Sequence, residues 1–161
     1  MFPTIAIANE FLELAAREGV SLSQMKLQKL VYFAYGWSLA LRGDPLVNEQ
    51  VECWDYGPVF PSLYRRTKRY GADPILGRIV AIDGIEPRLP VDAPSDVRDL
   101  IQAVWDSYKT HSAIKLSNMT HTPDSPWTGV RKMYADRKMP VPEGTDIPED
   151  LIRTYFQKLA G

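Results

Sequence analysis

The sequence has few of the side chains that most enzyme and metal sites need. Among 161 residues there are one cysteine, Cys53, and two histidines, His111 and His121. A lone cysteine excludes an internal disulfide framework and fits a reducing compartment. A structural zinc site takes about four Cys, His or carboxylate ligands, commonly at short paired spacings. The sequence offers no such pairs, and we expect neither a metal nor another cofactor.

Long apolar runs and excess charge are also missing. No apolar run approaches the ~18 residues that a membrane-spanning helix needs, and the N-terminus lacks the basic start of a signal peptide. The formal net charge is −1 at pH 7, so no overall field draws the chain toward membranes or nucleic acid. We expect a cytoplasmic protein without a membrane partner, folded as one domain over residues 1–161, and nucleic acid is a disfavoured partner.

Helical periodicity dominates the rest of the sequence. Apolar residues recur every three or four positions over 4–17, 95–108 and 148–159, and each pattern predicts an amphipathic helix. The stretch from about 22 to 42 is apolar nearly all round, which indicates a central helix. We expect Ser21 to cap this central helix and Ser95 to cap the helix over 95–108. Shorter helices are expected near 61–70, 112–119 and 126–134.

The expected β structure is small. Apolar and polar residues alternate over 51–54, which predicts a strand exposed on one face. Gly57 and Pro58 predict a sharp turn into the next helix. Residues 72–95 are irregular, and the run 79–84 is typical of half a small hairpin. The predicted fold is mainly α, with six or seven helices around the 22–42 helix and two or three short strands.

The stretch LSNMTHTPDSPW (116–127) admits two interpretations. His121 and Asp124 could serve a hydrolase, with Cys53 as a nucleophile if a base activated it. Alternatively, Ser125 and Pro126 start a helix, and His121 donates a hydrogen bond to a free carbonyl at the end of the helix before it. The second interpretation gives each polar residue a local role, and we favour it.

A basic cluster offers another alternative, a nucleic-acid-binding regulator. Residues 64–70 hold Arg65, Arg66, Lys68 and Arg69 between two tyrosines, whose rings could stack on bases. Cations in a last helical turn also offset the helix dipole. Because the chain as a whole is not basic, we favour the dipole interpretation.

Three blocks of sequence resemble a known family. MKLQKLVYFAYG (25–36), VECWDYGPVFPSLY (51–64) and the 116–127 stretch, in that order, resemble the Panacea domain, the SocA-like family of antitoxins often carried by phages and prophages. The segment 147–159 is similar to the last helix of that family. The resemblance implies a largely helical fold and no catalytic residue. It implies a non-enzymatic role, the neutralisation by direct binding of a toxin protein encoded by the adjacent gene. Family members are paired with many unrelated toxins, so the resemblance does not name the toxin.

The matched positions fall into two groups. Most resemble core and turn positions of the family and are expected to be structural: Leu27, Leu30, Tyr32, Gly57, Pro58, Ser117, Thr120, His121, Pro126 and Trp127. Protein interfaces are anchored mainly by aromatic and arginine side chains. The expected partner-binding residues are Lys26, Lys29, Trp54, Tyr56, Tyr64, Arg65 and Arg69. A homodimer, and delivery of the toxin to a protease, stay open as further possibilities.

Overall fold

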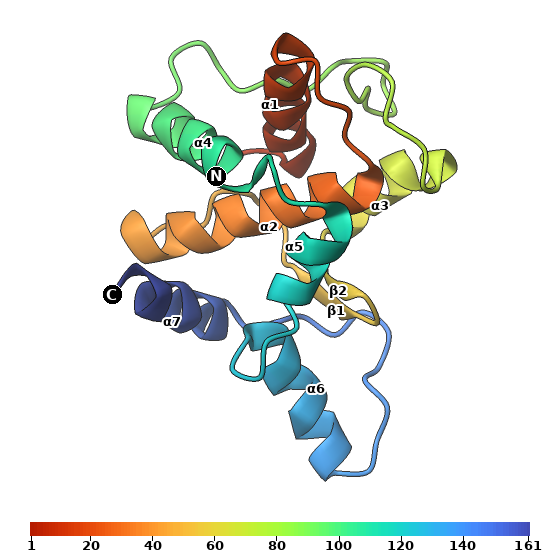
Figure 1. The fold of residues 1–161 in the computed structure, drawn as a ribbon, viewed down its shortest axis with the longest axis vertical. Helices are drawn as coiled ribbons and strands as arrows, with labels where there is room; N and C mark the ends of the chain where they lie inside the picture. The colour runs from red at the N-terminus through yellow and green to blue at the C-terminus, as the bar shows by residue number, and fades with distance from the viewer.

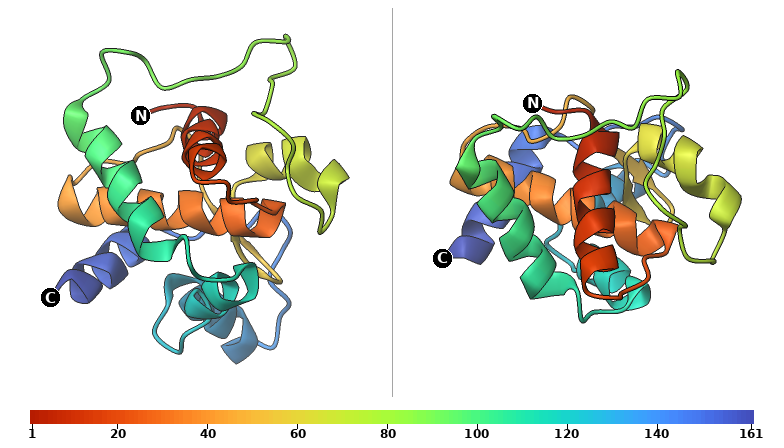
Figure 2. Two further views of the ribbon diagram at one scale, coloured as in Figure 1. Left: turned by 45° about the horizontal axis from the view of Figure 1, so that its top comes forward. Right: turned by 90° about the horizontal axis from the view of Figure 1, so that it is seen from above.

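Helix α2 (Gln24–Leu41) forms the centre of the fold. The computed structural model describes residues 1–161, and the elements follow in chain order (Figure 1): α1 (Thr4–Arg17), α2, β1 (Glu52–Trp54), β2 (Gly57–Val59), α3 (Pro61–Thr67), the 3₁₀ helix η1 (Lys68–Tyr70), α4 (Ser95–Tyr108), α5 (Ala113–Met119), α6 (Pro126–Asp136) and α7 (Glu149–Ala160). Helices α1 and α4 touch each other and both lie across α2 (Figure 2), while α7 packs along another side of α2. The predicted mainly helical class with a small β element is confirmed.

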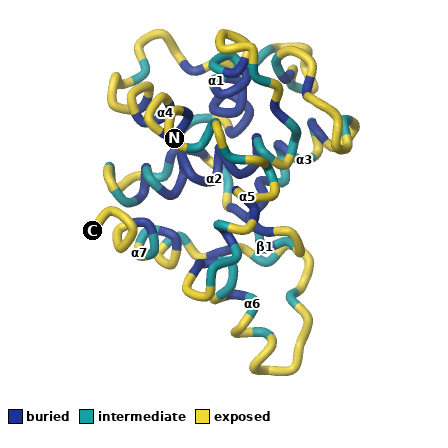
Figure 3. Tube along the Cα trace, viewed as in Figure 1, coloured by how far each residue is buried: buried dark blue, intermediate teal, exposed yellow.

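Burial follows the helical pattern that the sequence predicts. Twelve residues of α2 are buried, more than in any other helix, which confirms its central position. Figure 3 shows this contrast between α2 and the exposed segments near 72–94 and 137–146. The largest aromatic cluster forms between α2 and α7, where the ring of Phe156 meets the rings of Tyr32, Phe33 and Trp37 edge-on. None of the helices has both the length and the hydrophobicity needed to span a bilayer.

Two predicted helix caps are wrong. Ser23, not Ser21, caps α2, because the Ser23 side chain accepts a hydrogen bond from the backbone N–H of Lys26 at 3.3 Å. Leu22 is fully buried just before this cap, and Leu27 is buried on the first turn after it, which is the spacing of a hydrophobic staple. Burial of Leu22 therefore fixes where the helix starts. At α4 the cap residue is Pro94, and Ser95 is already helical.

The two strands form an antiparallel hairpin. Glu52 pairs with Val59, Cys53 with Pro58 and Trp54 with Gly57, so residues 55–56 form the tip. The other edge of β1 is covered by the segment after α6, through hydrogen bonds from Cys53 N to Thr145 O and from Ile147 N to Val51 O, both 2.8 Å. The strand predicted over 51–54 is confirmed, but the turn predicted at 57–58 is wrong. Residues 57–59 pair with β1 as strand β2, so the chain reverses at residues 55–56 instead.

The hairpin predicted from residues 79–84 does not form. Only a turn is present, with Ala81 N donating to Ile85 O at 2.8 Å. The reason lies on α1, where the buried side chain of Asn9 hydrogen-bonds both the N–H and the C=O of Ile79 and also the carbonyl of Pro87. The amide of Asn9 thus takes the place of a partner strand.

Two glycines in helices provide a test of the α2–α7 contact. A β-carbon at Gly36 would overlap the ring of Phe156, whereas one at Gly129 on α6 would meet nothing within 4 Å. Gly→Ala in a helix interior is otherwise stabilising by about 1 kcal/mol. We expect Gly36→Ala to lower the free energy of unfolding by about 1–3 kcal/mol and Gly129→Ala to raise it by up to about 1 kcal/mol. Urea denaturation measures both, and a stabilised Gly36→Ala variant would contradict the packing.

Candidate partner-binding site

Side chains from three helices hold the backbone of the β1–β2 hairpin. Alternate carbonyls along it each accept a hydrogen bond: Trp54 O from Trp127 Nε1 (2.6 Å), Tyr56 O from Ser117 Oγ (3.1 Å), Pro58 O from Lys29 Nζ (3.0 Å) and Phe60 O from Gln28 Nε2 (3.0 Å). Gln28 also accepts from Phe60 N at 2.9 Å. We call the four donor residues, Gln28, Lys29, Ser117 and Trp127, the hairpin clamp.

The clamp joins the three sequence blocks that carry the family resemblance. Gln28 and Lys29 come from the first block, the carbonyls from the second, and Ser117 and Trp127 from the third. Close approach requires a glycine at the tip. Gly57 has φ +117°, and a β-carbon there would lie 2.8 Å from Lys29 Nζ and 2.9 Å from Thr120 Oγ1.

Lys29 is a buried cation without an acidic partner. Its side chain lies under the hairpin, the residue is only 2% exposed, and no carboxylate is within 4.0 Å of its amine. Burial lowers the pKa of Lys29 to about 8. Lys26, the other lysine expected at the partner surface, is half-buried and donates to Lys109 O at 2.5 Å. Both lysines therefore bind the protein's own backbone.

His121 packs as an aromatic ring and does not form the predicted backbone hydrogen bond. Its ring stacks on Trp127 with centroids 4.0 Å apart and planes 15° apart, and Arg131 lies 4.9 Å from the centre of the Trp127 ring. The buried Nε2 atom has no hydrogen-bond partner. Burial lowers the pKa of His121, and the charges of Lys29 and Arg131 lower it further. The nearby carbonyl of Tyr56 acts in the opposite direction and raises it. The ring is thus kept neutral next to two cations.

The residues of the hydrolase alternative are not arranged for catalysis. His121 and Asp124 are not hydrogen-bonded to each other, and Asp124 is exposed. Cys53 is buried, its Sγ is 3.9 Å from the carbonyl of Trp127, and burial raises its pKa to about 11. A nucleophilic thiol needs the opposite shift. No three His, Cys, Asp or Glu side chains are grouped as a metal site would require.

The helix cap predicted at Ser125 is confirmed. Its hydroxyl accepts a hydrogen bond from Thr128 N at 3.2 Å and donates to Thr120 O at 2.7 Å. Pro126 follows as the first helical residue of α6, so Trp127 lies in the first turn, where its indole reaches the hairpin. Leu27, Leu30, Tyr32, Pro58 and Pro126 are buried, as expected of structural positions.

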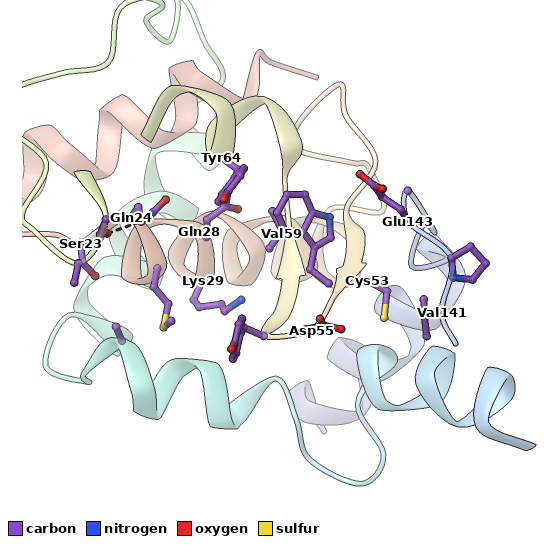
Figure 4. Close-up of a pocket in the computed structure, with 18 residues that line it drawn as sticks. Ser23, Gln24, Gln28, Lys29, Cys53, Asp55, Val59, Tyr64, Val141 and Glu143 are labelled. Carbon is purple, nitrogen blue, oxygen red and sulfur yellow. Dashed lines mark hydrogen bonds between the residues drawn. The ribbon is translucent and has the colours of Figure 1, made fainter. Parts of the chain in front are cut away.

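A groove of about 860 Å³ lies beside the clamped hairpin. Its walls come from the start of α2, the hairpin, α3 and the segment between α6 and α7, and they include Met25, Gln28, Lys29, Trp54, Asp55, Tyr56, Val59, Tyr64, Val141 and Glu143. Figure 4 shows Gln24 and Tyr64 toward one end of the groove and Val141 and Glu143 toward the other, with Lys29 and Asp55 between them. Half of the lining residues are hydrophobic.

Four of the seven expected partner-binding residues line this groove. They are Lys29, Trp54, Tyr56 and Tyr64. The rings of Trp54 and Tyr64 meet edge-on with centroids 4.7 Å apart, and Tyr56 at the hairpin tip is 75% exposed. Arg65 and Arg69 are exposed on the α3–η1 segment that follows Tyr64. Lys26 lies outside the lining.

Sequence reasoning missed two parts of the site. Gln28 is the one polar residue between the lysines of MKLQKL, and its position inside an apolar helix was a signal that it has a buried partner. The wall formed by Val141, Pro142, Glu143 and Gly144 had no signal, because its place depends on how the 137–148 segment returns to β1.

The fold and this site define a small, mainly helical protein with a half-hydrophobic groove beside a hairpin whose backbone is held by three helices. The chain belongs to the family described as antitoxin SocA-like, Panacea domain, whose profile matches residues 27–128. It is also 34% identical over 125 residues to the antitoxin SocA of Caulobacter vibrioides (strain NA1000 / CB15N). That match covers 76% of this chain and 66% of the relative, so the chain spans just under two thirds of the relative's length. No solved structure matches the chain significantly.

The clamp lysine gives the fold a characteristic pH dependence. The pKa of Lys29 is about 8 in the folded chain, against 10.5 ordinarily, so between these values the unfolded state binds more protons. Stability therefore rises with pH in this window. We expect the free energy of unfolding of the wild type, relative to Lys29→Met, to increase by about 2 kcal/mol between pH 8 and pH 10.

Comparison with Lys29→Met removes the contributions of other groups that titrate in the same range, including Cys53, whose raised pKa acts in the opposite direction. Lys115→Met, at an exposed position on α5, controls for the loss of a lysine. Chemical denaturation at pH 7, 8, 9 and 10 supplies the data. A constant difference between wild type and Lys29→Met across this range would mean that Lys29 is not held in a buried, charge-disfavouring site.

Proposed function

We propose that this chain is a non-enzymatic antitoxin that neutralises a toxin protein, encoded by the adjacent gene, by direct contact through the groove. The observation that carries the proposal is the exposed aromatic tip of the hairpin beside a half-apolar groove, in a chain that belongs to an antitoxin family. The proposed compartment is the cytoplasm, where an unpaired cysteine stays reduced.

The clamp supports binding because it fixes the contact surface before a partner arrives. A two-stranded hairpin alone is marginal in water, and ordering it on association would reduce the affinity. Here four side-chain hydrogen bonds and the pairing of β1 with residues 145–147 order it in the free protein. In this proposal Lys29 is a positioning residue, and the contacts come from Trp54, Tyr56 and Tyr64.

Tyrosine and tryptophan at the centre of an interface carry a large share of the binding energy. Tyr56 projects from the hairpin tip and makes no side-chain hydrogen bond within the chain, so its surface is free for a partner. Its backbone carbonyl, by contrast, is held by Ser117. The position can therefore be altered without loosening the clamp.

Co-expression tests this function. The product of the adjacent gene should arrest growth alone, and this chain should restore growth and copurify with it. We expect Tyr56→Ala to weaken the complex about 10–100-fold while stability stays within about 0.5 kcal/mol of wild type. Calorimetric titration of the purified proteins measures the affinity.

Ile82→Ala is the matched control, since Ile82 is 90% exposed in the segment 72–94, outside the groove. It should neutralise as the wild type does. The proposal fails if the wild type neither restores growth nor associates with the adjacent-gene product.

A further inference from the structure

The cations of α3 and η1 have no acidic partners. Arg65, Arg66, Lys68 and Arg69 form no ion pair, although cations elsewhere on the surface do, such as Arg42 with Asp96 and Arg78 with Glu86. The one polar side-chain contact in the cluster joins Arg69 to the hydroxyl of Tyr70 at 3.2 Å. Four neighbouring positive charges are thus left uncompensated.

Two of these cations lie close to Tyr64, the residue of α3 that lines the groove. Lys68 N donates to Tyr64 O, so Lys68 is one helical turn beyond Tyr64 and shares its face. Arg65 directly follows Tyr64 and is three residues before Lys68, so Arg65 and Lys68 are neighbours on the helix surface. The groove lining continues after them with Gly71 and Ala72. Arg65 and Lys68 are thus next in the chain to the Tyr64 end of the groove without being part of its lining, and we call this pair the cationic rim.

The charges inside the groove are also unevenly distributed, with the acids away from the cationic rim. Lys29 in the wall is a cation with no carboxylate nearby. The acids of the groove lie away from the rim: Glu143 is at the far end, and Asp55 is paired with Arg131 at 3.3 Å. A charged group that enters at the Tyr64 end is thus favoured if it is negative.

We propose that the groove binds an acidic segment of the toxin that also carries an apolar anchor. The anchor occupies the surface formed by Trp54, Val59 and Tyr64, and the acidic side chains face Arg65 and Lys68. This inference rests on the proposed function and adds the chemistry of the partner. A protein segment fits better than nucleic acid, because the lining is half hydrophobic, holds two carboxylates, and belongs to a chain of net charge −1.

Charge reversal of the rim tests the inference. The double variant Arg65→Glu/Lys68→Glu is compared with Arg137→Glu/Lys158→Glu, which changes the net charge equally at two other exposed helix ends without ion pairs. The probe is the purified product of the adjacent gene. We expect the rim variant to bind at least 10-fold more weakly, chiefly through slower association, and the control pair to bind within about threefold of wild type. Circular dichroism confirms that both variants fold.

Each other outcome has a definite meaning. If the wild type binds the toxin and the rim variant binds equally well, this inference fails and the proposed function stands. If the wild type does not bind the toxin, both the proposed function and this inference are wrong. A 20-nucleotide duplex that binds the wild type but not the rim variant, with toxin binding unchanged, would assign the rim to nucleic acid. A dimer lost only in the rim variant, seen by sedimentation, would assign it to a second copy of the chain.

Discussion

The hydrogen bonds from Gln28, Lys29, Ser117 and Trp127 to alternate carbonyls of the hairpin are the constraint on which the rest of the site depends. The four carbonyls lie on β1, on the turn at residues 55–56, on β2 and directly after β2, so donors from α2, α5 and α6 together hold the whole hairpin. Each buried donor left without an acceptor would destabilise the fold by about 1–3 kcal/mol. The hairpin and the three helices therefore fix one another's positions.

This constraint accounts for a buried lysine that has no counterion. A lysine stem is long enough to pass beneath the hairpin and donate to Pro58, which has no N–H and leaves its strand without a ladder donor there. The shift of its pKa to about 8 corresponds to about 3 kcal/mol of burial cost. Burial lowers the pKa of His121, and the charges of Lys29 and Arg131 lower it further, so the neutral ring is favoured beside the two cations. Packing and position thus explain His121, a candidate of the hydrolase alternative, and Lys29, one of the expected partner-binding residues.

Periodicity was enough to predict α1, α4 and α7, because each has an apolar stripe that packs against α2. It failed where a distant side chain decides the local structure. Asn9 organises residues 79–87 from 70 to 78 positions away, and the burial of Leu22 selects Ser23 over Ser21 as a cap. The same limit applies to the site. The sequence predicts Lys26 and Lys29 as partner-binding residues, but only the fold shows that both donate to backbone carbonyls.

A clamp that acts on backbone carbonyls places no demand on the side chains it presents. Asp55 and Tyr56 lie at the tip, and both are exposed while the backbone around them is held by Ser117 and Trp127. Substitution at the tip can then change the side chains beside the groove, where we propose the toxin binds, without removing a single clamp bond. Substitution of a clamp residue has the opposite effect, since it loosens the hairpin whatever the partner is. A fold of this kind can keep its framework fixed while its contact surface diverges, which is the physical requirement for one antitoxin family to meet many different toxins.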